Sequence, residues 1–148
     1  MVKVHLYEPT SLLGRIICWR TWGPYSHVAV EIDGKLYESM EGDGVRSSSA
    51  FDEGNLILCP TVTTEQEALM LEWWVERLGS KYDYWSIGAW LFRWKELKRS
   101  EDDYFCSEAV VESFEHAGIK LFLRKDAYKI SPSDIPTSLI MEQECTEQ

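Results

Sequence analysis

A histidine and a cysteine, distant in the sequence, are the residues best suited to carry out chemistry. His27 lies near the start of a predicted strand, Ser26–Ile32. Cys106 lies at the start of a predicted helix, Phe105–Ala117, which Gly118 ends. A thiolate attacks a carbonyl carbon, and a neighbouring imidazole can take up and return the proton. If the fold brings the two together, the pair predicts a thiol-dependent hydrolase.

A predicted hairpin adds a carboxylate to this pair. Asp33–Gly34 is a strong two-residue turn signal between two strand-like segments, so Ile32 is expected to pair with Lys35. Counting back along this register places Glu38 diagonally from His27 on the same face. A carboxylate there can accept the proton of one imidazole nitrogen and leave the other nitrogen facing the thiol. The sequence therefore predicts Glu38 as the third member of a triad.

The predicted position of Cys106 suits a reactive thiol. The first turn of a helix has unpaired backbone N–H groups and the positive end of the helix dipole, and both favour a thiolate. A nearby imidazolium of His27 favours it further. The backbone N–H of Cys106 is a candidate oxyanion donor. Tyr7, Tyr25 and Tyr104 are candidate side-chain donors, and the sequence does not select among them.

Short motifs around both residues resemble the NlpC-like papain superfamily. The segments Tyr25–Val30 and Asp33–Ser39 resemble its histidine hairpin. The segment Tyr104–Val110, followed by Ala117–Ile119 and Ser131–Ile135, resembles its cysteine helix and the chain after it. The resemblance covers most of the chain between the first and the last of these segments.

The order of the motifs is similar to the permuted branch of that superfamily, where the histidine precedes the cysteine. This branch includes YiiX-like and YaeF-like proteins and relatives of lecithin:retinol acyltransferase, and Gly44–Arg46 also resembles it. The resemblance implies a circularly permuted papain-like fold with a small antiparallel sheet or open barrel packed against helices. It also implies an acyl-enzyme on Cys106, with His27 as general base and Glu38 as the polar third residue.

The order of predicted elements indicates an α+β fold with an antiparallel sheet. A first helix follows the cap Thr10 or Ser11. A capping box at Thr64–Glu67 begins a long helix that ends at Gly79. Asp83 caps another helix through Trp94, which is followed by an acidic break at Ser100–Asp103. A short helix opens at Ser131–Asp134. Strands are predicted over Val2–Tyr7, Ser26–Ile32, Lys35–Met40 and Leu56–Cys59, with a polar loop or short extension over Gly42–Ser49.

Composition narrows the class of protein. A chain of 148 residues is one expected domain, 1–148, with a frayed tail over 141–148. The net charge of −10 argues against nucleic acid as a partner, because phosphate binding needs clustered Lys and Arg. No cofactor is expected, and no metal site is expected because the Cys and His spacings match no zinc motif. The expected partner is a peptide-like or acyl-containing small substrate, and the sequence does not predict an oligomeric state.

The four cysteines are expected to be free thiols, which fits a reducing cytosol. The N-terminus has no apolar run typical of a signal peptide, and no stretch is long and apolar enough for a membrane span. A cytoplasmic location is therefore expected. His5 and His116 have no evident partner and are expected to be structural or exposed. One of Trp73 and Trp74 is expected to meet solvent, a partner or another element.

Two alternatives stay open beside the amidase or peptidase. A lipid-directed thiol acyltransferase or esterase is supported by the aromatic and basic residues of Trp85–Arg99. For that segment and for Leu12–Trp22, packing of a core face is the preferred interpretation over membrane contact. A non-catalytic module that binds a peptide or lipid through tryptophans is the other alternative.

Overall fold

The computed structural model describes residues 1–82, 104–123 and 126–141. Within them, five strands form an antiparallel sheet in the order β4-β3-β2-β1-β5. These strands are β1 (Val2–Tyr7), β2 (His27–Ile32), β3 (Lys35–Met40), β4 (Gly44–Ser48) and β5 (Leu56–Leu58). The predicted α+β class and antiparallel sheet are therefore confirmed. Residues 83–103, with their predicted helix and acidic break, lie outside the described part.

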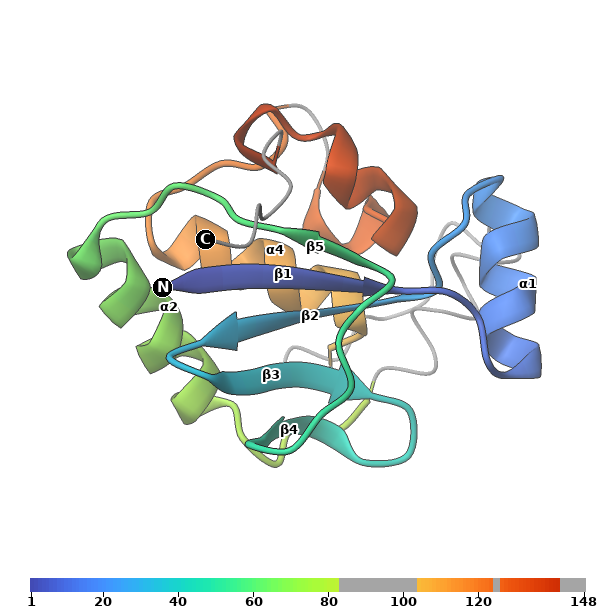
Figure 1. The fold of residues 1–148 in the computed structure, drawn as a ribbon, viewed down its shortest axis with the longest axis horizontal. Helices are drawn as coiled ribbons and strands as arrows, with labels where there is room; N and C mark the ends of the chain where they lie inside the picture. Colours follow the sequence, from blue (N-terminus) through green and yellow to red (C-terminus); the bar gives the residue numbers. More distant parts are fainter. Residues whose placement is uncertain (83–103, 124–125, 142–148) are drawn as a thin grey trace.

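Helices lie on one face and at one end of this sheet (Figure 1). They are α1 (Leu12–Thr21), α2 (Thr64–Glu76) and α4 (Cys106–His116), followed by the 3₁₀ helices η1 (Ala127–Lys129), η2 (Pro132–Thr137) and η3 (Leu139–Met141). Helix α4 packs against β2, β3 and α2, whereas α1 stands apart at the opposite end of the molecule from α2.

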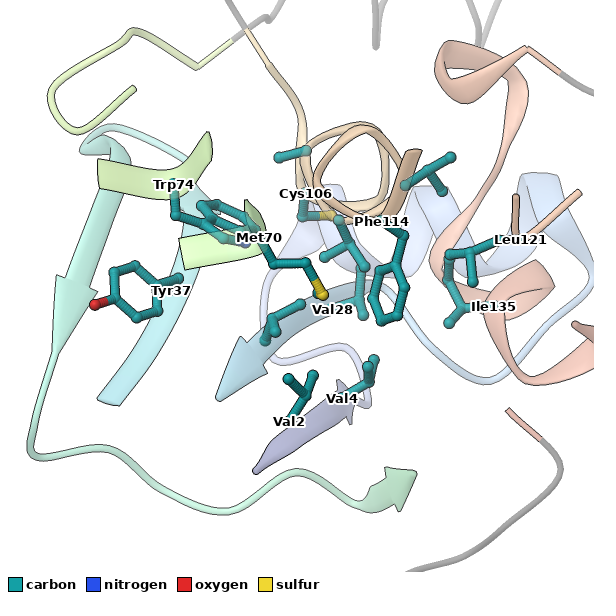
Figure 2. Packing of buried hydrophobic residues seen from close by; sticks show 14 of the residues in the cluster. Val2, Val4, Val28, Tyr37, Met70, Trp74, Cys106, Phe114, Leu121 and Ile135 are labelled. Carbon is teal, nitrogen blue, oxygen red and sulfur yellow. The ribbon is translucent and has the colours of Figure 1, made fainter. Parts of the chain in front are cut away.

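The alternation of side chains along each strand gives the sheet two different faces. Val4 on β1 and Val28 on β2 are fully buried and belong to the main core. Side chains of the sheet, α2 and α4, among them Met70 and Phe114, meet in this layer (Figure 2). Because neighbours along a strand point to opposite faces, the odd-numbered residues of β2 face away from the body of α4, and only His27, at the start of the strand, reaches the end of α4 that carries Cys106. The sheet thus separates an apolar helix-covered face from a polar face.

The β2–β3 hairpin has the register that its turn predicts. Ile32 pairs with Lys35, and the ladder continues to Val30 opposite Tyr37. Asp33 and Gly34 have φ angles of 50° and 74°, as a type I′ turn requires at both central positions. The predicted register of this hairpin is therefore confirmed over the pairs that form the ladder.

The segment left open as a polar loop or short extension is a strand. Residues of β4 pair with β3 from Gly44 opposite Met40 to Ser48 opposite Leu36. Serine and arginine in this strand conceal the apolar alternation that marks the others. The strand adds Arg46 directly opposite Glu38, and this pairing matters for the site.

The predicted bounds of α2 are wrong by a few residues. Thr63, not Thr64, is the N-cap, and its side chain and that of Gln66 bond reciprocally to each other's backbone N–H. The helix ends at Glu76 instead of Gly79, because Gly79 lies in the following turn and donates its N–H to the Val45 carbonyl. Tertiary contact with β4 therefore ends the helix early.

Burial bears on two further predictions. Trp73 and Trp74 are both buried, which excludes solvent for either ring: Trp74 enters the main core, and the Trp73 ring packs on Tyr104 and under Arg77, whose Cζ lies 4.4 Å from the ring centroid. The tail expected over 141–148 does not begin at Met141, which is buried at the end of η3. The expected short helix after Ser131 is present as η2, in 3₁₀ form with Pro136 inside it.

The cysteines do not all remain thiols. Cys59 is disulfide-bonded, which contradicts the expectation of four free thiols. Cys18 and Cys106 are free. The cysteines therefore do not indicate a reducing compartment. In the part of the chain that the structure describes, no helix has the length and apolar character needed to cross a bilayer.

Candidate active site

The first residue of β2 and a residue of β3 form a close pair. His27 Nε2 lies 2.7 Å from Glu38 Oε2. Glu38 is buried, and His27 keeps 18% of its side chain exposed. The hairpin count predicted this neighbourhood, and the contact is present. Since Nε2 is held by Glu38, Nδ1 is the imidazole nitrogen that remains for a second partner.

Arg46, which has no role predicted from the sequence, also binds the carboxylate of Glu38. Arg46 donates from Nε at 3.0 Å and from Nη2 at 2.8 Å to Glu38 Oε1. Its Nη1 also donates to Asp43 at 2.6 Å. The cross-strand pairing of Glu38 with Arg46 would have revealed this contact, but only if the β4 segment had been predicted as a strand. Glu38 therefore bridges an imidazole and a guanidinium.

The charges at this site reinforce each other. Burial lowers the pKa of His27, but hydrogen bonds to Cys106 and Glu38 and electrostatic attraction to both outweigh it and raise the pKa to about 9. Burial raises the pKa of Glu38, but its bonds to His27 and Arg46 outweigh that effect and hold the pKa below its ordinary value. At neutral pH the site therefore contains an imidazolium beside a carboxylate.

Cys106 lies at the start of α4, next to the start of β2. Its Sγ is 4.0 Å from the backbone carbonyl oxygen of Ser26, the residue directly before His27. The N-cap residue Phe105 makes no side-chain capping bond to the first-turn N–H groups. The predicted helix start at Cys106 is confirmed, and with it the supply of backbone donors beside the sulfur. The thiol is 2% exposed.

Buried hydrogen bonds hold this helix start in place. Ser39 on β3 donates its hydroxyl to the Tyr104 carbonyl, and the Tyr104 N–H donates to Lys81 at 3.2 Å. Ser107 donates to the carbonyl of Ile130. These contacts come from three separate segments of the chain. They explain how a strand residue and a helix residue far apart in sequence come to share one site.

A cleft opens on the polar side of the sheet beside His27. Its volume is about 670 Å³, and its lining includes His27, Glu38 and Arg46. Helix α1 contributes one wall, and residues 50–52 and 55 contribute another. The chain between β4 and β5 crosses this side of the sheet (Figure 1), and Gly54 approaches β1 so closely that a Cβ there would meet the backbone of Leu6. Ser26, whose carbonyl oxygen lies near Cys106 Sγ, also lines the cleft, whereas Cys106 itself is not among the lining residues.

The three candidate tyrosines lie in different places. Tyr7 lines the cleft, its ring centroid is 5.6 Å from that of His27, and its hydroxyl donates to the Asp52 carbonyl at 3.0 Å. Burial and the nearby charges of Glu38 and Asp52 raise the pKa of Tyr7 to about 12, so it remains a proton donor. Of the three, only Tyr7 lines the cleft.

Tyr25 and Tyr104 are engaged elsewhere. The backbone of Tyr25 is bound on both sides by the Ser133 hydroxyl, at 3.0 and 2.9 Å, and its side chain packs on the main core. The Tyr104 hydroxyl accepts from Arg77 at 3.2 Å. Neither lines the cleft.

His5 forms a second histidine–glutamate contact and has a structural role, one of the two roles expected for it, although the sequence showed no evident partner. Its Nε2 lies 2.9 Å from Glu31, and its Nδ1 accepts from the Gly54 N–H at 3.2 Å. The ring is buried against Phe51. This histidine fastens the crossing segment to β1, and His116 is exposed, as predicted.

The site residues do not form a cage for a metal ion. Among the residues with described positions, no three or more His, Cys, Asp or Glu side chains converge in a way that could hold one. At Glu38, the guanidinium of Arg46 takes the oxygen that faces away from His27, and its positive charge opposes a cation.

Comparisons with known proteins place the fold. No protein-family model matches the sequence, and no curated protein sequence matches it. The structure is similar to a crystal structure of the metalloprotein YiiX from Escherichia coli O157:H7, DUF1105, with a TM-score of 0.71 and 15% sequence identity. The match covers 99% of this chain and 96% of that one. At this identity the likeness shows the fold alone: the chain has a YiiX-like α+β fold with an open five-stranded antiparallel sheet.

Proposed function

We propose that this protein is a cysteine-dependent hydrolase that acts on an amide or ester through an acyl-enzyme on Cys106. The observation that carries the proposal is the ordered set of Cys106, His27 and Glu38, with the imidazole bonded to the carboxylate and in electrostatic contact with the thiol. In this proposal Cys106 is the nucleophile and His27 transfers the proton. Glu38, held by Arg46, orients the ring and stabilises its charged form.

Acylation would begin with a thiolate and an imidazolium. The sulfur attacks the substrate carbonyl carbon, and the carbonyl electron pair moves onto oxygen to give a tetrahedral oxyanion. The N–H of Cys106 is our candidate donor to that oxyanion, with Tyr7 as the candidate side-chain donor from the cleft. The tetrahedral species then collapses, the bond to the leaving group breaks, and His27 gives its proton to that group.

Deacylation reverses the proton's direction. The neutral imidazole left after acylation takes a proton from water, and the resulting hydroxide attacks the thioester carbonyl. Collapse of the second tetrahedral species releases the carboxylic acid and restores the thiolate beside the imidazolium. His27 thus acts first as an acid and then as a base, and Glu38 stabilises the charged ring at both ends of the cycle.

Cysteine alkylation tests the proposed nucleophile with an internal control. Cys18 is a partly exposed free thiol whose pKa is raised by burial and by the charge of Glu8. We expect iodoacetamide at pH 7 to modify Cys106 before Cys18, because in the proposed site the charged ring of His27 lies beside the Cys106 sulfur. In His27→Ala the Cys106 rate should fall about tenfold or more while the Cys18 rate is unchanged. Peptide mapping by mass spectrometry measures both rates.

Trapping the acyl-enzyme tests the chemistry itself. Incubation with activated esters, peptide amides and phospholipids should leave an acyl group on Cys106, found by mass spectrometry and absent in Cys106→Ala. The acyl donor that labels fastest separates a peptide-directed from a lipid-directed enzyme. The proposal is wrong if Cys106→Ala retains full hydrolysis of the donor that the wild type turns over. Failure of every donor together with an unreactive Cys106 would favour the binding module.

A further inference from the structure

The outer face of α1 is apolar and exposed. Leu12 and Trp19 are 76% and 73% exposed, and Ile16 lies between them on the same stripe. Trp22, directly after the helix, is 91% exposed. The helical apolar pattern of this segment favours a core interpretation, and these exposures contradict it. Only the inner face of α1, with Gly14 and Ile17, is buried.

The charge around this stripe differs from the charge of the whole molecule. The chain contains 25 Asp and Glu residues and has a net charge of −10, yet residues 9–30 contain no acidic residue. The same stretch carries Arg15 and Arg20, which the helical projection places on either side of the apolar stripe. Arg15 is exposed. The acidic protein thus presents an apolar surface on α1, and that surface has a basic margin.

Tryptophan and arginine around an apolar stripe are typical of helices that lie in a membrane interface. The indole ring is apolar with one polar group, which suits the headgroup level, and arginine attracts anionic lipid. The acidic remainder of the molecule is repelled by such a surface, so charge alone turns α1 toward it. A polar or acidic protein partner would offer the two tryptophans and Leu12 less apolar surface to pack against.

We propose that the outer face of α1, defined by Leu12, Ile16, Trp19 and Trp22, docks on the surface of an anionic phospholipid bilayer. The opposite face of the same helix lines the cleft through Leu13, Gly14 and Ile17. A docked helix therefore places the cleft beside the bilayer. This surface is independent of the chemistry proposed for Cys106.

The backbone conformation of Trp22 allows a substitution that removes the indole without straining the fold. Trp22 has φ 56° and ψ 29°, a left-handed conformation that glycine usually adopts at the end of a helix. Trp22→Gly therefore removes the indole without straining the fold, and Trp19→Ser removes a second exposed ring. Val75→Ser, on the exposed side of α2, is the matched control for loss of an apolar surface residue.

Sedimentation of the whole protein with vesicles tests the proposal. We expect binding to phosphatidylcholine vesicles that contain phosphatidylglycerol, weakened by salt and weaker on phosphatidylcholine alone. The double variant Trp19→Ser/Trp22→Gly should bind at least about tenfold more weakly, because each indole contributes more than one factor of ten when buried. Val75→Ser should bind as the wild type does, and circular dichroism should show that all variants remain folded.

Other results would overturn the proposal. Absence of binding, equal binding to phosphatidylcholine alone, or undiminished binding of the double variant would each contradict it. Sedimentation velocity that shows a dimer abolished by the same two substitutions would assign the face to a second copy of the chain. Cys106→Ala should bind vesicles like the wild type, so failure of docking and failure of the proposed catalysis can be told apart.

Discussion

At the scale of single residues, Glu38 organises the site because it accepts bonds from two cationic groups at once. One oxygen faces His27 and the other faces Arg46. A buried carboxylate alone would tend to take up a proton, and these two partners keep it charged. The charged carboxylate in turn adds to the hydrogen bond with Cys106, and together they outweigh the effect of burial and raise the pKa of His27 above its ordinary value. The protonation states of the residues are therefore coupled.

Nuclear magnetic resonance of the imidazoles tests this coupling without a substrate. The chain has 3 histidines, so their ring signals are readily assigned. We expect His27 to titrate with a pKa of about 9 in the wild type. In Glu38→Gln its pKa should fall toward the ordinary value of 6.5, because the neutral amide no longer stabilises the imidazolium. An unchanged pKa of His27 in the variant would show that Glu38 does not set its charge.

At the scale of elements, the start of α4 is positioned by a strand and not by its own cap. Phe105 offers no capping side chain, whereas Ser39 on β3 reaches the Tyr104 carbonyl from the buried side. The same strand carries Glu38, one residue away on the opposite face. Strand β3 therefore places the carboxylate directly and positions the cysteine through the chain before it.

Removing the Ser39 hydroxyl should loosen this arrangement. Ser39→Ala leaves a buried carbonyl without its donor, which we expect to lower the free energy of unfolding by about 1–3 kcal/mol. The rate of Cys106 alkylation should also change, because the helix start is less well held. Ser48→Ala removes an exposed serine bond to Ala50 and should cost less than about 0.5 kcal/mol. Urea unfolding of both variants checks the difference, and equal stabilities would mean that Ser39 does not hold the helix start.

At the scale of the whole molecule, the site connects three adjacent strands through charge. His27, Glu38 and Arg46 lie on β2, β3 and β4 in turn. Because the pKa of Glu38 is lower in the folded state, this network stabilises the fold above the ordinary carboxyl pKa of 4.5. The stabilisation is lost as the pH falls through the lower folded-state pKa. Acid therefore weakens the contacts that hold the three strands together.

A substitution of Arg46 should show this pH window. Arg46→Met removes one partner of Glu38, and we expect the variant to be less stable than the wild type by roughly 1–2 kcal/mol near neutral pH, since solvent screens the half-exposed guanidinium. Below pH 4.5 the difference should shrink, because protonation of Glu38 removes the same interaction from the wild type. Urea unfolding across this range measures the two proteins, and a difference that stays constant with pH would contradict the linkage.

The sequence by itself determined the features that depend on near neighbours. The Asp33–Gly34 turn and the alternation beside it set the hairpin register, and this register brings Glu38 to His27. The end signal Gly118 and the amphipathic run before it defined α4 with Cys106 at its start. These are local choices, since turn geometry and side-chain periodicity act within a few residues of the chain.

Only the tertiary structure decided the rest. Arg46 joins the site through a strand whose polar residues conceal its periodicity, and Trp73 and Trp74 are both buried because α2 is covered from two directions. The disulfide of Cys59 and the exposed stripe on α1 were equally invisible in the sequence pattern. An apolar helical stripe looks the same in sequence whether it meets a core or solvent, because the pattern gives the face and only packing gives what covers it.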